Sequence, residues 1–308
     1  SQVNGISSAV NNFFDPNNQH TVKVLPFLGE YSWSVIIASL VLAFCVAAVL
    51  IGGVKRIASV SQVIVPFMAV IYIVFVLVLV VCNITAVPAA FATIVKAAFS
   101  PKAITGGAVG SFLVAMQKGV ARGIFSNEAG LGSAPIAAAA AQTKEPVRQG
   151  LVSMTGTFID TIVICTLTGL SIVLTGAWQV DGLEGVQVTT YAFQHGLPFP
   201  KELSAFVLML CLVFFAFTTI LGWDYYSERC LEYLSGGRMK YVKVYRWIYI
   251  LAVFIGPYMT VSAVWTIADI FNGLMALPNM IALFALSGVV VKETKHFFER
   301  HRNGEIED

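Results

Sequence analysis

Residues 119–135 read GVARGIFSNEAGLGSAP and interrupt a long apolar stretch of the chain. Four glycines weaken helix in this segment, and Pro135 has no backbone N–H to donate. Charged and polar residues stand where leucine would be expected, namely Arg122, Ser126, Asn127 and Glu128. Lipid cannot satisfy an unwound backbone, so this segment must be buried in protein or line a cavity. We expect a non-helical break between about Ile124 and Gly132, near the middle of the membrane.

The composition predicts the class of protein around this break. Hydrophobic residues make up 57% of the 308 residues, charged residues only 12%, and the mean hydropathy is +0.79. Soluble domains carry about 25% charged residues. The apolar residues form runs of about 20 or more, which is the length of a spanning helix. We therefore expect an all-α polytopic membrane protein with about seven transmembrane helices. They are predicted at 33–53, 61–84, 108–141 (broken), 151–177, 202–232, 242–259 and 268–291.

Basic residues are divided unevenly between the predicted loops. On one side lie Lys55, Arg56, Lys144, Arg148, Arg238, Lys240, Lys243, Arg246, Lys292, Lys295, Arg300 and Arg302. On the other lie only Lys23, Lys96, Lys102 and Lys201. Lys and Arg mark cytoplasmic loops. The sequence thus predicts a multi-pass protein of the cell (plasma) membrane with its C-terminus in the cytoplasm and the start of this chain outside.

The chain offers little for catalysis or cofactor binding. Its four histidines fall in predicted loops or the tail without metal-ligand spacing, which argues against a zinc site. It contains no Ser-His-Asp order, Walker loop or nucleotide fingerprint. We expect no enzyme, no cofactor and no nucleic-acid partner, only membrane lipid around the spans. Two alternatives stay open: an ion channel, which would need a polar stripe along several helices, or a partial membrane subunit that does not transport.

Interrupted helices near the midplane hold substrates and ions in secondary transporters. A helix that begins after the break, near Gly132 to Pro135, presents free N–H groups and a positive dipole end to a carboxylate. The helix before the break, ending near Ile124 to Ser126, leaves free carbonyls for an ammonium group or sodium. The alternative is a glycine-rich packing kink without a ligand.

Thr218 and Thr219 form a second polar position inside an apolar run. Their hydroxyls offer a hard cation oxygen ligands without net charge, and Trp223, one turn on, can wall a small pocket. The alternative is that each threonine donates a hydrogen bond to its own i−4 carbonyl.

Four ionisable side chains at membrane depth are either gating or ion-coordinating groups, or members of internal salt bridges. We favour salt bridges for Arg122 and Asp224. Both interpretations stay open for Glu128 and Asp160.

Six stretches spread over nearly the whole chain are long enough to point to a family. They are QVNGIS (2–7), GVARGIFSNEAGLGSAPIAAAAAQT (119–143), EPVRQGLV (145–152), GTFIDTIVICTLTGL (156–170), FAFTTILGWDYYSE (215–228) and ADIFNGLMALPNMIALFALSGVVVKET (268–294). Together they resemble the alanine/glycine:cation symporter family, the sodium:alanine symporters.

The resemblance implies a leucine-transporter-type fold, in which two inverted five-helix repeats follow one extra helix. This chain would run from the end of core helix 3 to core helix 10, as a single membrane domain over 1–308. It would comprise the end of the first repeat with an outer loop (1–107), the second repeat (108–291) and a cytoplasmic tail (292–308). The family's first broken helix, with its GTGNIAG segment, is not in this sequence. We therefore expect a C-terminal fragment whose partners include the missing N-terminal helices of the same protein.

The resemblance also implies the function, sodium-coupled symport of alanine or glycine by alternating access, with Na⁺ as the coupling ion. The implied substrate residues are Gln2, Phe125, Ser126, Asn127, Ala129, Gly130 and Trp223. The implied sodium residues are Thr218, Thr219 and Asn127. Phe125 and Trp223 are large enough to limit the pocket to a hydrogen or methyl side chain.

Overall fold

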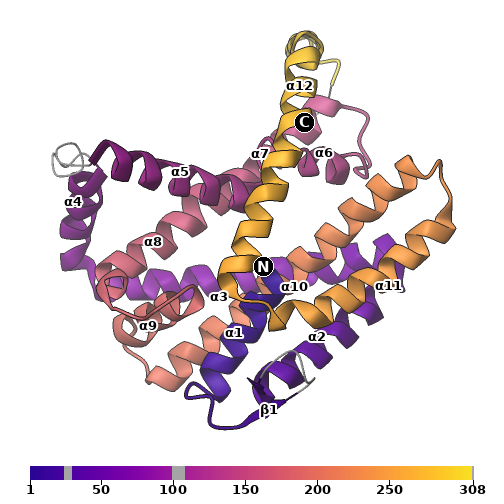
Figure 1. Ribbon diagram of the computed structural model, residues 1–308. Helices are drawn as coiled ribbons and strands as arrows, with labels where there is room; N and C mark the ends of the chain where they lie inside the picture. Colours follow the sequence, from indigo (N-terminus) through magenta and orange to yellow (C-terminus); the bar gives the residue numbers. More distant parts are fainter. Residues whose placement is uncertain (24–29, 99–107, 307–308) are drawn as a thin grey trace. The chain divides into compact units, whose positions relative to one another are not determined.

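The computed structural model describes residues 1–23, 30–98 and 108–306 and consists largely of helices (Figure 1). The chain divides into two compact units. The first unit is Ser1–Phe99 with Leu167–Trp265, and the second unit is Ser100–Thr166 with Thr266–Asp308. The predicted repeat boundary after residue 107 borders the undescribed segment 99–107, so it stays a prediction. Lys102 lies in that segment, outside the described residues.

The first unit contains most of the helices and one short hairpin. Its elements are α1 (Gln2–Phe14), β1 (Thr21–Lys23), β2 (Glu30–Ser32), α2 (Trp33–Leu50), α3 (Gly53–Cys82), η1 (Ile84–Ala86), α4 (Val87–Ala98), most of α8 (Cys165–Leu174), η4 (Ala177–Gln179), α9 (Val186–Gly196), α10 (Lys201–Leu234), α11 (Met239–Ile255) and η5 (Gly256–Tyr258). β1 and β2 pair antiparallel, with Thr21 opposite Ser32.

The core of the first unit forms where α1, α2, α10 and α11 meet. Its buried residues are Ile6, Leu42, Val46, Leu50, Ala216, Ile220, Leu221 and Val253. Helices in a membrane associate through close packing rather than through transfer of apolar surface from water, and this cluster provides that packing for the four helices. Two polar contacts fix α1 and α2 against η5 and the residue after it: Asn4 Nδ2 donates to the Met259 carbonyl at 2.9 Å, and the hydroxyls of Ser39 and Tyr258 lie 3.0 Å apart.

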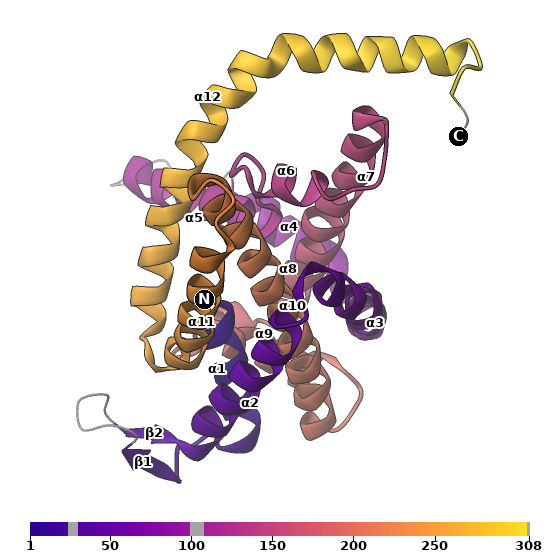
Figure 2. The ribbon, with the colours of Figure 1, turned by 90° about the vertical axis from the view of Figure 1, so that its right-hand side faces the viewer.

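The second unit consists of two interrupted or irregular helical segments and one long helix. Its elements are α5 (Ala108–Asn127), α6 (Ser133–Ala138), α7 (Pro146–Phe158), the π-helical turn η3 (Ile159–Ile164) and, from Thr266 on, α12 (Val261–Arg302). α7 runs through η3 into α8 without interruption. α12 contains Pro278, which removes one backbone donor and crowds the preceding turn. Figure 2 shows α12 bent along its length, as a proline inside a helix predicts.

Helices occupy all seven stretches for which spans are predicted, although their lengths differ. Among the described residues, five helices are long and apolar enough to cross a membrane. They are Trp33–Leu50, Gly53–Cys82, Pro146–Leu174, Lys201–Leu234 and Val261–Arg302. α11 has 17 residues, because its regular turns stop before Gly256 and Pro257. The all-α membrane architecture is confirmed, and the count of seven spans stays a prediction.

The predicted loop between the first two spans is wrong in length. α3 begins at Gly53 rather than near residue 61, so Lys55 and Arg56 lie in its first turn. Arg56 reaches back and donates to the Ala48 carbonyl at 3.0 Å, which satisfies one of the acceptors left at the end of α2. α2 and α3 are therefore connected by a tight turn, which this side-chain bond spans, and not by the longer loop that was predicted.

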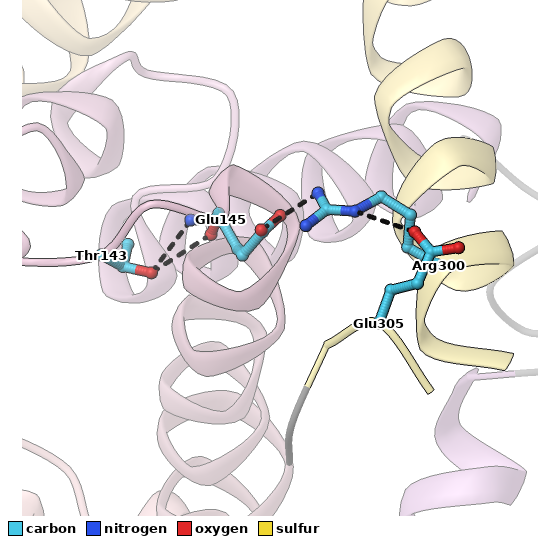
Figure 3. A network of polar contacts seen from close by, with 4 residues as sticks. All are labelled: Thr143, Glu145, Arg300 and Glu305. Atoms are coloured by element: carbon cyan, nitrogen blue, oxygen red, sulfur yellow. Dashed lines mark hydrogen bonds and ion pairs between the residues drawn. The ribbon is translucent and has the colours of Figure 1, made fainter. Parts of the chain in front are cut away.

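An ion pair joins the end of α12 to the start of α7 within the second unit (Figure 3). Arg300 Nη1 lies 3.2 Å from Glu145 Oε1, and Arg300 Nε lies 3.9 Å from Glu305 Oε2. Glu145 is the N-cap residue of α7, and its N–H donates to Thr143 Oγ1 at 3.2 Å. The Arg300 and Glu145 side chains are 33% and 22% exposed, so the pair contributes modestly to stability.

Candidate functional site

The interruption predicted in the decisive segment is present. α5 ends at Asn127 and α6 begins at Ser133, which leaves Glu128–Gly132 without helix; we call these residues the break. Three of them have positive φ: Glu128 at 55°, Gly130 at 81° and Gly132 at 84°. Left-handed residues cannot continue a right-handed helix, and glycine adopts them without a Cβ clash. The local sequence therefore explains why the helix stops here.

Polar side chains at the end of α5 bond to the π-helical turn η3. Ser126 Oγ donates to Asp160 Oδ2 at 2.7 Å, and Asn127 Nδ2 donates to Thr161 Oγ1 at 3.1 Å. Thr161 Oγ1 in turn lies 3.2 Å from Asp160 Oδ2. We call Ser126, Asn127, Asp160 and Thr161 the polar cluster. π-helical turns are rare and often occur at functional sites. Here the turn places two adjacent polar residues against the helix end that precedes the break.

The break is also held from within and from α12. Asn127 Oδ1 accepts the Ala129 N–H at 2.9 Å, Asn279 Nδ2 donates to the Gly130 carbonyl at 2.9 Å, and Ser133 Oγ donates to the Glu128 carboxylate. The Ala129 N–H thus bonds to a side chain next to the break instead of continuing the helix of α5. α6 has only six residues, so it offers first-turn amides without the field of a long helix.

Arg122 takes part in an internal ion pair, as expected. Its Nη2 lies 2.7 Å and 2.6 Å from the two carboxylate oxygens of Asp269 on α12. Its Cζ also lies 5.9 Å from the centroid of the Phe125 ring. An open cavity of about 560 Å³ adjoins this pair, between α5 and α12. Its lining includes Ile124, one turn before the break, and Leu131, within the break, so the break adjoins open space inside the second unit.

The remaining predicted site residues lie in the first unit. Gln2 is in the first turn of α1, and Thr218, Thr219 and Trp223 are on α10. Thr218 Oγ1 donates to the Phe214 carbonyl at 3.0 Å, and Thr219 Oγ1 donates to the Phe215 carbonyl at 2.9 Å. These are the hydrogen bonds to the i−4 carbonyl that were considered as the alternative to cation binding. A hydroxyl that donates one hydrogen bond still has lone pairs for a cation, so both interpretations remain compatible with the contacts.

Residues 2–308 match the profile of the sodium:alanine symporter family. The chain belongs to this family. Its members are transporters rather than enzymes, which accounts for the apolar helices. The match also implies coupling to Na⁺ and transport of alanine as family properties.

Relatives of this family member come from several microorganisms. An uncharacterized transporter of Haemophilus influenzae is 55% identical over 267 residues, covering 86% of this chain and 58% of that protein. The sodium/alanine symporter AgcS of Methanococcus maripaludis is 48% identical over 271 residues, covering 87% and 58%. A protein of Bacillus subtilis named "Probable sodium/glutamine symporter GlnT" is 38% identical over 291 residues, covering 94% and 59%. The chain thus spans a little under three fifths of the length of these relatives.

Sequence reasoning missed three residues that hold the site together. Thr161, Ser133 and Asn279 each bond to a residue of the break or of the end of α5. A signal was present for Asn279, because Pro278 inside an apolar run marks a helix bend where a polar side chain can reach a neighbouring backbone. Nothing in the sequence pattern indicated Thr161, since its position depends on the π-helical turn.

Replacing Gly132 with alanine should destabilise the protein by about 1–2 kcal/mol. Gly132 has φ +84°, and an added Cβ would lie 3.2 Å from Asn279 Oδ1 and 3.3 Å from its Cγ. Thermal unfolding in lipid or detergent measures the effect. The control is Gly150→Ala in α7, where a Cβ meets nothing within 4 Å and should stabilise helix. Equal melting temperatures for Gly132→Ala and the wild type would contradict the left-handed backbone at the break.

Proposed function

We propose that the protein containing this chain is a sodium-coupled symporter of small neutral amino acids, alanine or glycine. It works by alternating access in the cell membrane, with the C-terminus in the cytoplasm. The observation that carries the proposal is the break with its polar cluster, in a chain of the sodium:alanine symporter family. The relative AgcS, named a sodium/alanine symporter, supports the same substrate. Because this chain spans under three fifths of its relatives, the activity belongs to the whole protein.

The break suits a zwitterionic ligand. An amino acid needs donors for its carboxylate and acceptors for its ammonium group. The first-turn amides of α6, at Ser133 and Ala134, provide donors, and the backbone carbonyls at the end of α5 provide acceptors. Ser126, Asn127, Ala129 and Gly130 line this backbone in the proposal. Thr218 and Thr219 contribute hydroxyl oxygens to the sodium ion. No covalent step is needed, because binding and release from alternate sides accomplish transport.

Uptake in proteoliposomes tests this function. The whole protein, with an inward sodium gradient, should accumulate labelled alanine with saturable kinetics, and collapse of the gradient with a sodium ionophore should abolish accumulation. Potassium in place of sodium serves as the control. An alanine flux that does not saturate would favour the alternative of a channel. Saturable uptake that does not depend on sodium would overturn the proposed coupling to sodium.

Substrate size should depend on two aromatic rings. Phe125 is held over Arg122, with the guanidinium carbon 5.9 Å from its ring centroid, and Trp223 is half-buried on α10. Replacing either with leucine in the whole transporter should admit serine, valine or leucine while weakening alanine about tenfold, the usual range for a changed hydrophobic pocket. Competition against labelled alanine uptake measures this, with glutamine included because of the relative GlnT.

The matched control is Phe271→Leu, an aromatic residue of α12 that is 60% exposed. Its competition profile should equal that of the wild type. If Phe125→Leu and Trp223→Leu both leave the profile unchanged as well, neither ring bounds the pocket.

A further inference from the structure

Asp224 is a buried carboxyl group that the proposed symport leaves without a role. Its relative exposure is 0%, and it follows Trp223 on α10. Within the described part of the chain, neither of its oxygens receives a hydrogen bond. An ionised carboxylate removed from water needs a donor or a counter-charge. The expectation of a salt bridge at Asp224 is therefore wrong for the described residues, because the neighbouring basic group is already engaged.

That basic group is Arg246 on α11, which is bound to Glu228, one turn after Asp224 on α10. Arg246 Nε lies 2.6 Å from Glu228 Oε1, and Nη2 lies 2.9 Å from Oε2. Glu228 is itself buried, at 4% exposure. The Arg246 guanidinium thus makes a bidentate ion pair with the Glu228 carboxylate. Asp224 and Glu228 are four residues apart on α10, so their side chains lie on the same face of the helix. The side chains of Asp224, Glu228 and Arg246 together carry one uncompensated negative charge when both acids are ionised.

The helices packed against this part of α10 supply no further cation. α1 and α2 contain no charged residue, and the charged residues of α3 and α9 are exposed: Lys55, Arg56 and His195. From α11, Tyr249 donates its hydroxyl to the Ile220 carbonyl at 2.8 Å, and Tyr245 has Ser227 as a hydrogen-bond partner. The other basic residues of α10 and α11 near this end are exposed or paired, namely Arg229, Lys240 and Lys243. The excess charge at Asp224 has to be neutralised from solution.

We propose that Asp224 is a proton-binding site. A proton from water forms an O–H bond at one Asp224 oxygen, and this hydroxyl donates to a Glu228 oxygen while Glu228 keeps its bonds to Arg246. No electrons move, and the charge of the three side chains changes from minus one to zero. Two adjacent carboxyls share a proton in this way because both cannot be ionised at close range. A metal ion fits less well, since it would lie beside the fixed charge of Arg246.

This proposal adds proton binding to the proposed symport and does not depend on it. Infrared spectroscopy of the whole protein in lipid, with ¹³C at the aspartate carboxyl carbons, tests it. At neutral pH, the labelled-minus-unlabelled spectrum should show the carbonyl stretch of a protonated, buried aspartic acid. The band should disappear in Asp224→Asn and persist in Glu202→Gln, which removes an exposed carboxylate from the first turn of the same helix.

Stability provides a second readout. An exposed aspartate is ionised above about pH 4, so the unfolded chain does not hold this proton near neutrality. The folded-to-unfolded ratio of the wild type relative to Asp224→Asn should then fall as pH rises, by up to about tenfold per pH unit. A wild-type spectrum without the band overturns the proposal, even if Asp224→Asn fails to fold. Sodium-dependent melting in the wild type that is lost in Asp224→Asn, without the band, would identify a metal site instead.

Discussion

Replacing Asn127 with alanine in the whole transporter should lower the initial rate of alanine uptake about 30- to 150-fold. Asn127 makes two bonds, to Thr161 Oγ1 at 3.1 Å and to the Ala129 N–H at 2.9 Å, and both set the geometry of the break. At about 1–1.5 kcal/mol each, their loss amounts to about 2–3 kcal/mol, with 1.4 kcal/mol per factor of ten. Uptake of labelled alanine below saturation, normalised to folded protein, measures the effect.

Two further variants separate the bonds of Asn127. Asn127→Asp keeps the acceptor for Ala129 but removes the donor to Thr161 and adds a charge beside Asp160, so it should also be impaired. The matched control is Asn303→Ala, which removes an exposed asparagine bonded to Glu305. If Asn127→Ala transports as well as Asn303→Ala, the polar cluster has no part in transport.

Replacing Thr219 with valine should raise the sodium concentration for half-maximal uptake about tenfold or more. Valine keeps the shape of threonine and removes one oxygen, and a bond to a charged group is worth about 1.5–3 kcal/mol. Thr218→Val should act in the same direction, and Thr219→Ser should retain the wild-type value. Uptake rates measured over a range of sodium concentrations provide the half-saturation values.

The control for this series is Thr190→Val on α9. Thr190 Oγ1 donates to the Val186 carbonyl at 3.0 Å, which is the same i−4 bond that Thr219 makes with Phe215. Loss of this bond alone should leave the sodium dependence unchanged. Should Thr218→Val and Thr219→Val both behave like Thr190→Val, the cation binds elsewhere.

The features that could be predicted from the sequence are those that depend only on the local sequence of one segment. The break was expected between Ile124 and Gly132 and lies at Glu128–Gly132, because glycines at positive φ and a proline act locally. The apolar runs located the helices for the same reason. Arg122 was expected in an ion pair and has one, although its partner Asp269 lies 147 positions away and was not identified.

The features that could not be predicted depend on contacts between segments. The π-helical turn at Ile159–Ile164 changes which residues face α5, and hydrophobic periodicity does not encode it. Asn279 bonds to Gly130 across 149 positions, which a single sequence cannot reveal. A salt bridge was expected for Asp224 without an identified partner, and in the fold the guanidinium of Arg246 makes both of its bonds to Glu228 instead.

Two polar contacts among the described residues join the long helix α12 to the chain around α6. Asn279 holds the Gly130 carbonyl ahead of α6, and Arg300 pairs with Glu145 after it. Asn279 and Arg300 are 21 positions apart, which corresponds to about 30 Å along a helix, close to the thickness of the hydrocarbon core. The stretch from α6 to the start of α7 is thus attached to α12 at both of its ends, and it cannot move away from α12 unless one of these contacts opens. The half-buried Arg300–Glu145 pair joins two charged groups, so dissolved salt screens it. Ionic strength therefore weakens the contact after α6 while the Asn279 hydrogen bond remains, independently of any ion bound at the site.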